Sequence, residues 1–249
     1  MTRDDRSDGQ PQLVLWDIDK TLVDVSGFGQ TAYAEAFTRV TGQPFTMTFS
    51  FGGLTELAMI HTVLGHHGMP AEDDLVAELF EQLAEVHRES ADHLATHGRL
   101  LPGAAEAVQA VGSLPGVRQS VLTGNMRSIG ELKIGLFGLD KWLDLSIGAF
   151  GDEDLGRPDL LPRAWRNAEA AYGETYTASQ TVVIGDTVRD MEVATRHGAF
   201  GVGVGSGPES TQALSDAGAD VALDGLGEIE HLLSAISRAR GRTARDSDQ

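Results

Sequence analysis

The chain has 249 residues, enough for one large domain or two smaller ones. Its 19 basic and 37 acidic residues give a formal net charge of −18, which argues against binding to nucleic acid or to an anionic membrane. The absence of cysteine excludes disulfides, thiolate metal ligands and a cysteine nucleophile. Neither a signal peptide nor an apolar run of membrane length is found, so the expected compartment is the cytoplasm.

Short apolar runs alternate with segments of helical periodicity along most of the chain. The runs predicted as strands are Leu13–Trp16, Gln119–Leu122, Leu143–Ile147, Thr181–Ile184, Phe200–Val204 and Asp220–Leu223. The intervening segments predicted as helices are Ala104–Val111, Ile129–Phe137, Leu160–Tyr172, Met191–His197 and Ile229–Arg240. This alternation predicts an α/β fold with a parallel sheet that is covered on both faces. Ligands of such sheets bind beyond the carboxyl ends of the strands.

The segment after the first strand breaks the alternation. It shows almost no strand pattern, and its predicted helices are Gly29–Val40, Thr55–Leu64 and Asp73–Leu94. Because the segment is far longer than one crossover requires, we expect an inserted α-helical cap domain rather than a long helical crossover. The expected division is a core of residues 13–23 and 101–240, a cap of residues 24–100, and disordered tails of residues 1–12 and 241–249.

The first predicted strand ends in two carboxylates, Asp17 and Asp19. Because side chains alternate along a strand with a period of two, both leave the strand end on the same side. Two like charges this close need a cation, a proton or a ligand to offset them. The pair is therefore a candidate metal site, or a nucleophile with a general acid; the alternative is an acidic turn capped by Thr21.

The second predicted strand leads into Thr123, Gly124 and Asn125, which precede a helix. A hydroxyl, a glycine and a free helix N-terminus together form a candidate oxyanion or phosphate site. The alternative is that Thr123 or Asn125 only caps the helix.

A candidate cation, Arg157, stands before Pro158 at the start of a predicted helix. It could hold a phosphate and neutralise clustered carboxylates, or it could be a solvated surface residue. Lys133 and Lys141 are competing cations, and their helical or amphipathic contexts place both in water.

A second pair of acidic residues, Asp186 and Asp190, follows the strand predicted over Thr181–Ile184. Oxygen ligands of this kind suit Mg²⁺, which binds through one or two carboxylates and keeps several waters. The alternative is an acidic N-cap with a first-turn aspartate that complements the helix dipole.

These four motifs, each at a strand end or the start of a helix, are expected to meet at one edge of the sheet. Together they resemble those of the haloacid dehalogenase-like (HAD) hydrolase superfamily, and within it the phosphoglycolate phosphatase-like group with a helical cap. The resemblance runs from about residue 13 to residue 223. Two positions depart from the family pattern, since Lys20 replaces a glycine and Arg157 stands where lysine is more common.

The resemblance implies a Rossmann-like core and a role for each motif. It implies that Asp17 is the transiently phosphorylated nucleophile and Asp19 the acid/base. The residues implied to bind phosphate are Thr123, Gly124, Asn125 and Arg157, and those implied to hold Mg²⁺ are Asp17, Asp186, Asp190 and Asp19 through its backbone carbonyl.

The expected function is therefore Mg²⁺-dependent hydrolysis of a small phosphate monoester through an aspartyl-phosphate intermediate. The alternatives are a sugar-phosphate mutase of the same fold and a non-catalytic binding or regulatory protein. The expected partner is a small phosphorylated metabolite, with no nucleic acid and no membrane, and the expected state is a monomer or homodimer.

Other segments give less specific signals. The loop from Phe49 to Leu54 is equally compatible with substrate contact and with ordinary packing. A metal site at His61, His66 and His67 is not favoured, because such spacing is common at surfaces. We expect His87, His93 and His97 to be partly exposed on one helix face.

Overall fold

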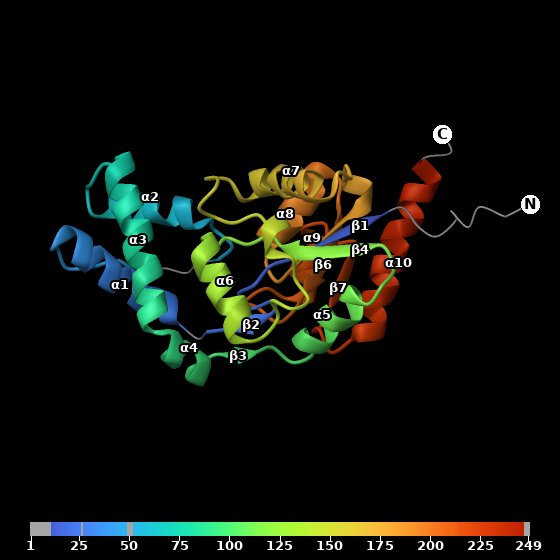
Figure 1. Cartoon of the computed structure of the whole chain (residues 1–249), viewed down its shortest axis with the longest axis horizontal. Coiled ribbons are helices and arrows are strands. Elements are labelled where there is room, and N and C mark those ends of the chain that lie inside the picture. The colour runs from blue at the N-terminus through green and yellow to red at the C-terminus, as the bar shows by residue number, and fades with distance from the viewer. Residues whose placement is uncertain (1–10, 26, 49–51, 247–249) are drawn as a thin grey trace, which may run out of the picture.

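The computed structural model describes residues 11–25, 27–48 and 52–246, with side chains described as far as residue 240. Its centre is a five-stranded parallel sheet in the order β4-β1-β5-β6-β7 (Figure 1). The strands are β1 (Gln12–Trp16), β4 (Val117–Val121), β5 (Thr181–Gly185), β6 (Phe200–Val204) and β7 (Val221–Leu223). Strands β1, β5 and β6 are buried along their whole length, as expected for a sheet covered on both faces. The predicted α/β fold is confirmed.

Alternate residues of β1 pack into different hydrophobic clusters on the two faces of the sheet. Val14 and Trp16 join the cluster formed with α5 (Ala104–Gly112) and α10 (Ile229–Asp246). Leu13 and Leu15 join the cluster formed with α7 (Leu160–Tyr172) and α8 (Val188–His197). The remaining core helices are α6 (Arg127–Leu136), α9 (Thr211–Asp216) and the 3-10 turns η1 (Leu145–Ile147), η2 (Arg157–Asp159) and η3 (Ala178–Gln180).

Four helices form a helical unit beside the sheet: α1 (Phe28–Thr41), α2 (Glu56–His66), α3 (Asp73–Glu89) and α4 (Ala91–His97). Figure 1 shows them gathered at one end of the molecule, with α6 between them and the sheet. Phe37, Ile60 and Leu83 lie in a hydrophobic cluster of their own, which Met126 and Ile129 of the α6 region complete. The helical unit thus has its own core and rests on α6.

The helical unit and the core are joined by a short antiparallel ribbon, β2 (Val23–Asp24) with β3 (Arg99–Leu100). The carboxylate of the buried Asp24 accepts hydrogen bonds from Lys20 and Arg99, each at 2.5 Å. It therefore holds together the two chain segments that connect the helical unit to the core.

A second connection lies where α2 begins. The Glu56 amide donates to the Gly124 carbonyl at 2.7 Å, and the Leu57 amide donates to the Gly151 carbonyl at 2.9 Å. A Cβ on Gly124 would lie 2.1 Å from the Leu54 carbonyl oxygen, so this approach of two backbones requires glycine. The start of α2 is therefore held against the core.

Three sequence predictions are wrong in detail. Leu143–Ile147 is not a strand: Asp144 accepts from the Ser146 amide at 3.0 Å and closes the turn η1. Gln12 is not part of a disordered tail, because it begins β1 and its side chain donates to the Ile236 carbonyl at 3.2 Å. The backbone is also helical beyond residue 240, since α10 continues to Asp246.

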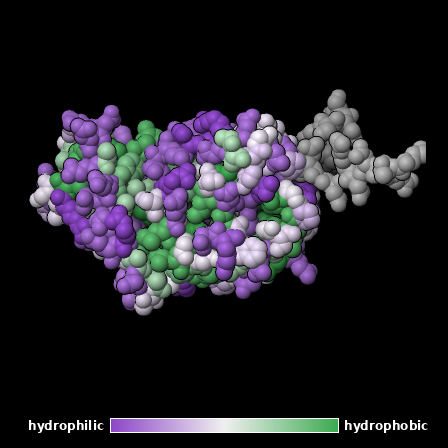
Figure 2. Space-filling model, viewed as in Figure 1, coloured by the Kyte–Doolittle hydropathy of each residue, from purple (hydrophilic) through white to green (hydrophobic). Residues whose placement is uncertain are grey.

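The surface is predominantly polar. Figure 2 shows hydrophilic residues over both the helical unit and the core, with apolar residues gathered mainly around α6. Among the described residues, Leu155 is the large apolar side chain that stands exposed. None of the helices in this part of the chain is both long enough and apolar enough to cross a membrane.

Candidate active site

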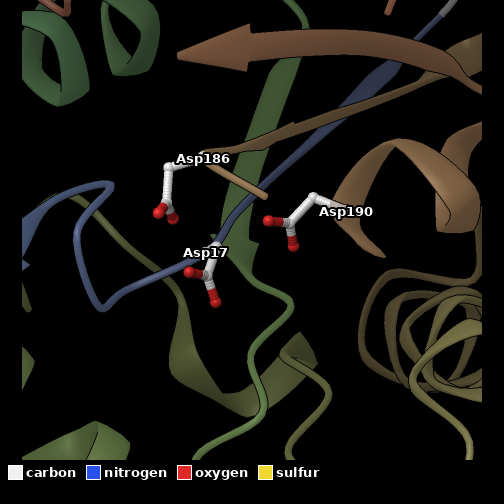
Figure 3. A group of neighbouring side chains, drawn as sticks. All are labelled: Asp17, Asp186 and Asp190. Atoms are coloured by element: carbon white, nitrogen blue, oxygen red, sulfur yellow. The ribbon is translucent and has the colours of Figure 1, made fainter. Parts of the chain in front are cut away.

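The strand order brings the predicted acidic residues to one edge of the sheet. Asp17 follows β1 and Asp186 follows β5, and these strands are neighbours. Asp190 reaches the same place from the first turn of α8. Figure 3 shows the three carboxylates directed toward one another, and one oxygen from each lies within 4.8 Å of the others.

Burial and mutual repulsion make ionisation of this cluster costly. Burial, together with the nearby Asp190 and Asp19, raises the pKa of Asp17 to about 7, although Arg157 opposes the shift. Burial, Asp17 and Asp190 raise the pKa of Asp186 to about 8. A divalent cation would remove this cost, and three carboxylates form the oxygen-only donor set that suits Mg²⁺. The residues present therefore fit the metal that the sequence implies.

Arg157 is buried in the turn η2 and links two members of the cluster. Its Nη2 donates to Asp17 at 2.6 Å and to Asp190 at 2.5 Å. Its Nε–H is buried without a hydrogen-bond partner among the described residues. Since an unmet buried donor is costly, the guanidinium suits an additional anionic ligand. The surface-arginine alternative does not hold.

Asp190 is fixed by the protein through both of its oxygens. One accepts from Arg157, and the other accepts from the Thr187 amide at 3.0 Å and the Thr187 hydroxyl at 2.7 Å. A Cβ on Gly185 would lie 2.2 Å from the Asp190 carboxyl carbon, so glycine is needed there. Asp190 is therefore both a capping residue of α8 and a member of the acidic cluster.

Asp19 has a different environment from Asp17. Lys133 donates to its two oxygens at 2.8 and 2.6 Å, and Asn125 Nδ2 donates to it at 2.7 Å. Burial acts to raise the pKa of Asp19, but Lys133 and Asn125 outweigh it and the pKa is lowered. Of two carboxylates two residues apart, one is thus stabilised as the anion, whereas burial and neighbouring carboxylates disfavour ionisation of the other.

The prediction that Lys133 lies in water is wrong, whereas Lys141 is exposed as expected. Lys133 is buried in α6 and also donates to Asn125 Oδ1 at 2.7 Å. A signal was present in the sequence, because Lys133 follows the apolar Ile129 by four residues and so shares its helix face. A lysine within an apolar stripe needs a buried acidic partner, and Asp19 is that partner.

Thr123 and Asn125 follow β4 in the chain; both are buried, and neither caps α6. The residue preceding α6 is Met126, and the Arg127 amide donates instead to Asp152 at 3.0 Å. The Thr123 hydroxyl accepts from Asn125 Nδ2 at 2.9 Å. The capping alternative is therefore wrong for this segment.

These groups line a cavity of about 630 Å³ between the core and the helical unit. The predicted residues on its lining are Asp17, Asp19, Thr123, Gly124, Asn125, Arg157 and Asp186. Lys20 also lines it and has a φ of 64°, which explains why a glycine would be favoured at that position.

The helical unit adds Tyr33, Glu56 and His87 to the lining. Of these three, the sequence draws attention only to His87, for which partial exposure is expected. That expectation is wrong, because His87 is buried on α3, whereas His93 and His97 are exposed on α4. Gly52, Gly53 and Leu54 line the cavity, while Phe49–Phe51 of the predicted substrate loop lie outside the described residues. Within the described part of the chain, the acidic cluster is the candidate metal group, and His61, His66 and His67 form none.

Comparisons with known proteins agree with this geometry. A family model described as haloacid dehalogenase-like hydrolase matches residues 11–198. "Probable phosphatase IndB" from Dickeya dadantii (strain 3937) is 26% identical over 217 residues, which cover 87% of this chain and 91% of that protein.

Two solved structures share the fold. A hydrolase from Pseudomonas syringae is 22% identical with a TM-score of 0.65, covering 91% of this chain and 99% of the other. A predicted phosphatase from Clostridium acetobutylicum is 15% identical with a TM-score of 0.66, covering 90% of this chain and 99% of the other. At these identities the likeness shows a common fold.

Proposed function

Because this chain belongs to the haloacid dehalogenase-like hydrolase family and is a hydrolase, we propose that it is a Mg²⁺-dependent phosphatase. Its substrate would be a small phosphate monoester, hydrolysed through a phosphoryl group carried by Asp17. The observation that carries this proposal is that Asp17 and Asp19 have different surroundings. The first lies in an acidic cluster beside Arg157, and the second is bound to Lys133 and Asn125. The similarity to a protein named as a phosphatase supports the same reaction class.

In the first half-reaction, an oxygen of Asp17 attacks phosphorus and the bond to the leaving alkoxide breaks. Arg157, with its unmet Nε–H, binds the phosphoryl oxygens together with Thr123, Gly124 and Asn125. Asp19, which must carry a proton at this step, gives it to the leaving oxygen so that the alcohol departs neutral, and Lys133 stabilises the carboxylate that remains.

In the second half-reaction, Asp19 is the base. Its carboxylate removes a proton from water, the water oxygen attacks phosphorus, and the bond from phosphorus to Asp17 breaks. The ionised form of Asp19 that Lys133 stabilises is the form this step requires. The products are inorganic phosphate and free Asp17.

We assign the Mg²⁺ site to Asp17, Asp186 and Asp190 with the backbone carbonyl of Asp19. A bound Mg²⁺ supplies positive charge that lets an anionic carboxylate approach an anionic phosphate. This local charge, with that of Arg157, also opposes at the site the repulsion of an anionic substrate that the net charge of −18 implies.

We propose that the helical unit is a cap that excludes water from the reaction and selects the alcohol. Its contribution to the cavity lining supports this role, as does the ribbon of β2 and β3 that joins it to the core. The proposal retains a small phosphorylated metabolite as the partner, no nucleic acid or membrane, and a monomer or homodimer.

The test is phosphate release from a panel of small monoesters by the purified full chain, with Mg²⁺ and with EDTA. We expect release that EDTA abolishes and that added Mg²⁺ restores. A protein that binds Mg²⁺ but releases no phosphate from any ester would refute the proposal. Transfer of phosphate between two positions of a sugar, without release, would replace it with a mutase.

A further inference from the structure

The cavity has two walls of different character. The core wall carries Asp17, Asp19 and Arg157, whose charges face one another. The helical wall is largely apolar, with Tyr33, Leu54 and Met59. The helical wall also carries two buried polar groups with no role in the proposed reaction, Glu56 and His87.

Glu56 is the first residue of α2, and its position is fixed by the bond from its amide to the Gly124 carbonyl. One carboxylate oxygen accepts from the Tyr33 hydroxyl at 2.6 Å, and the other accepts from the Met126 amide at the long distance of 3.4 Å. A carboxylate offers about four acceptor positions. Glu56, only 8% exposed, therefore has room to accept further hydrogen bonds from a molecule in the cavity.

His87 on α3 is a second acceptor. Its Nδ1–H donates to the Leu83 carbonyl at 2.8 Å, because a carbonyl oxygen can only accept. Burial and the nearby Lys133 lower the pKa of His87 to about 4, so the ring is neutral at pH 7. The lone pair is then on Nε2, and His87 lines the cavity as a hydrogen-bond acceptor.

The described lining offers no uncommitted cation for a second anionic group. Arg157 is committed to the acidic cluster, Lys133 to Asp19, and Lys20 to Asp24. Arg189 packs its side-chain carbons near Gly53 but is exposed and outside the lining. The net charge of −18 adds long-range repulsion of multiply charged anions.

We propose that the alcohol released by this enzyme is uncharged and carries at least one hydroxyl besides the esterified one, whose proton is accepted by Glu56 or by His87. This inference rests on the proposed phosphatase function and names its substrate class. Esters with a carboxylate or a second phosphate on the alcohol are then poor substrates, because the carboxylate of Glu56 and the lone pair of His87 would face that anion. An ammonium would have to lose its water beside His87, where burial already disfavours a positive charge.

The experiment compares four small esters on the wild-type chain: ethylene glycol monophosphate, 2-phosphoglycolate, phosphoethanolamine and ethyl phosphate. Their alcohols all have two carbons, and the second carbon carries a hydroxyl, forms a carboxylate, carries an ammonium or is a methyl group. We expect kcat/KM for the glycol ester to exceed that for each of the others by at least about tenfold. This comparison depends on no variant.

Two variants then test the residues. We expect Glu56→Gln or His87→Gln, whichever residue accepts the proton of this hydroxyl, to lower kcat/KM for the glycol ester by about tenfold and to leave that for ethyl phosphate within about twofold. No loss in either variant would overturn the assignment. His61→Gln, an exposed histidine on α2, is the matched control and should change neither value. Equal losses for both esters would show a structural role and overturn the assignment.

The outcomes separate the two proposals. Phosphate release with 2-phosphoglycolate or phosphoethanolamine as the best ester would overturn this inference and leave the phosphatase function standing. Release at equal kcat/KM from all four esters would do the same. No release from any ester, with Mg²⁺ bound, would overturn the proposed function and this inference with it.

Discussion

The core wall and the helical wall of the cavity hold their buried polar groups by different contacts. On the core wall, carboxylates lie against cations: Arg157 contacts Asp17 and Asp190, and Lys133 contacts Asp19. On the helical wall, Glu56 accepts a hydrogen bond from the Tyr33 hydroxyl, and His87 donates one to the Leu83 carbonyl.

This difference corresponds to the separate roles proposed for the two walls, reaction and recognition of the alcohol. Ion pairs keep a fixed geometry for bond making and breaking, while acceptors held by hydrogen bonds recognise an alcohol. The carboxylates of the core wall follow adjacent strands of the sheet, whereas the helical wall is assembled from residues of α1, α2 and α3. The helical wall can therefore change without disturbing the reaction.

The largest effect is expected from Asp17→Asn, which keeps the shape of the side chain and removes the nucleophile. We expect phosphate release to fall by at least about 10⁴-fold, because no covalent intermediate can form. Steady-state assays measure the loss, and mass spectrometry of quenched turnover should show one added phosphoryl group on the wild type only. Circular dichroism and the thermal melting temperature control for folding.

A variant with Asp17→Asn that kept more than about one per cent of the wild-type rate would contradict the role of Asp17, since a lost nucleophile costs far more. The two walls would then no longer differ in function, because the core wall would bind the substrate without supplying the nucleophile.

The next effect concerns Lys133, which keeps Asp19 ionised. Replacing it by methionine raises the pKa of Asp19, so the base of the second half-reaction is protonated over a wider range of pH. We expect kcat at neutral pH to fall about a hundredfold and the acidic limb of the pH profile to move to higher pH. Lys141→Met, at an exposed position, is the control. A loss of the same size at every pH would assign Lys133 a packing role instead.

The sequence predicts the core wall well because its signals are local. Asp17 and Asp186 follow buried strands, so an apolar run ending in an acid is visible without knowledge of the fold. Residues 160–172 are helical with the bounds expected from periodicity. The wrong prediction of a strand at Leu143–Ile147 also has a local cause, because the side chain of Asp144 accepts a hydrogen bond from the Ser146 amide and stabilises a turn within this apolar run.

The helical wall could not be predicted in the same way. Glu56 and His87 lie on different helices, and only the packing of α1, α2 and α3 brings them to one cavity. Helical spacing predicts one face for His87, His93 and His97, yet α3 ends at Glu89 and the separate helix α4 begins at Ala91. The environment of Lys133 is hidden in the sequence because its partner Asp19 is 114 residues away.

The smallest effect is a shift in thermal stability that depends on Mg²⁺ and pH. The folded pKa values of Asp17 and Asp186, about 7 and about 8, exceed the ordinary value of 3.8. The contribution of these two carboxyl groups to the free energy of unfolding is thus fully present below pH 4 and is lost as the pH rises through 7 to 8. Mg²⁺ binds the ionised carboxylates, so its stabilisation should grow over this range.

At ten times its dissociation constant, Mg²⁺ should add about 1.4 kcal/mol, or roughly 3–6 °C in Tm. Differential scanning fluorimetry at pH 6 and pH 8, at one fixed Mg²⁺ concentration, should show the larger increment at pH 8. Asp186→Asn should lose the increment, whereas Asp224→Asn, an exposed acid outside the cavity lining, should keep it. An increment that is equal at both pH values, or that survives in Asp186→Asn, would place the ion elsewhere. The buried carboxylates of the core wall would then be neutralised by bound protons instead of by a metal ion.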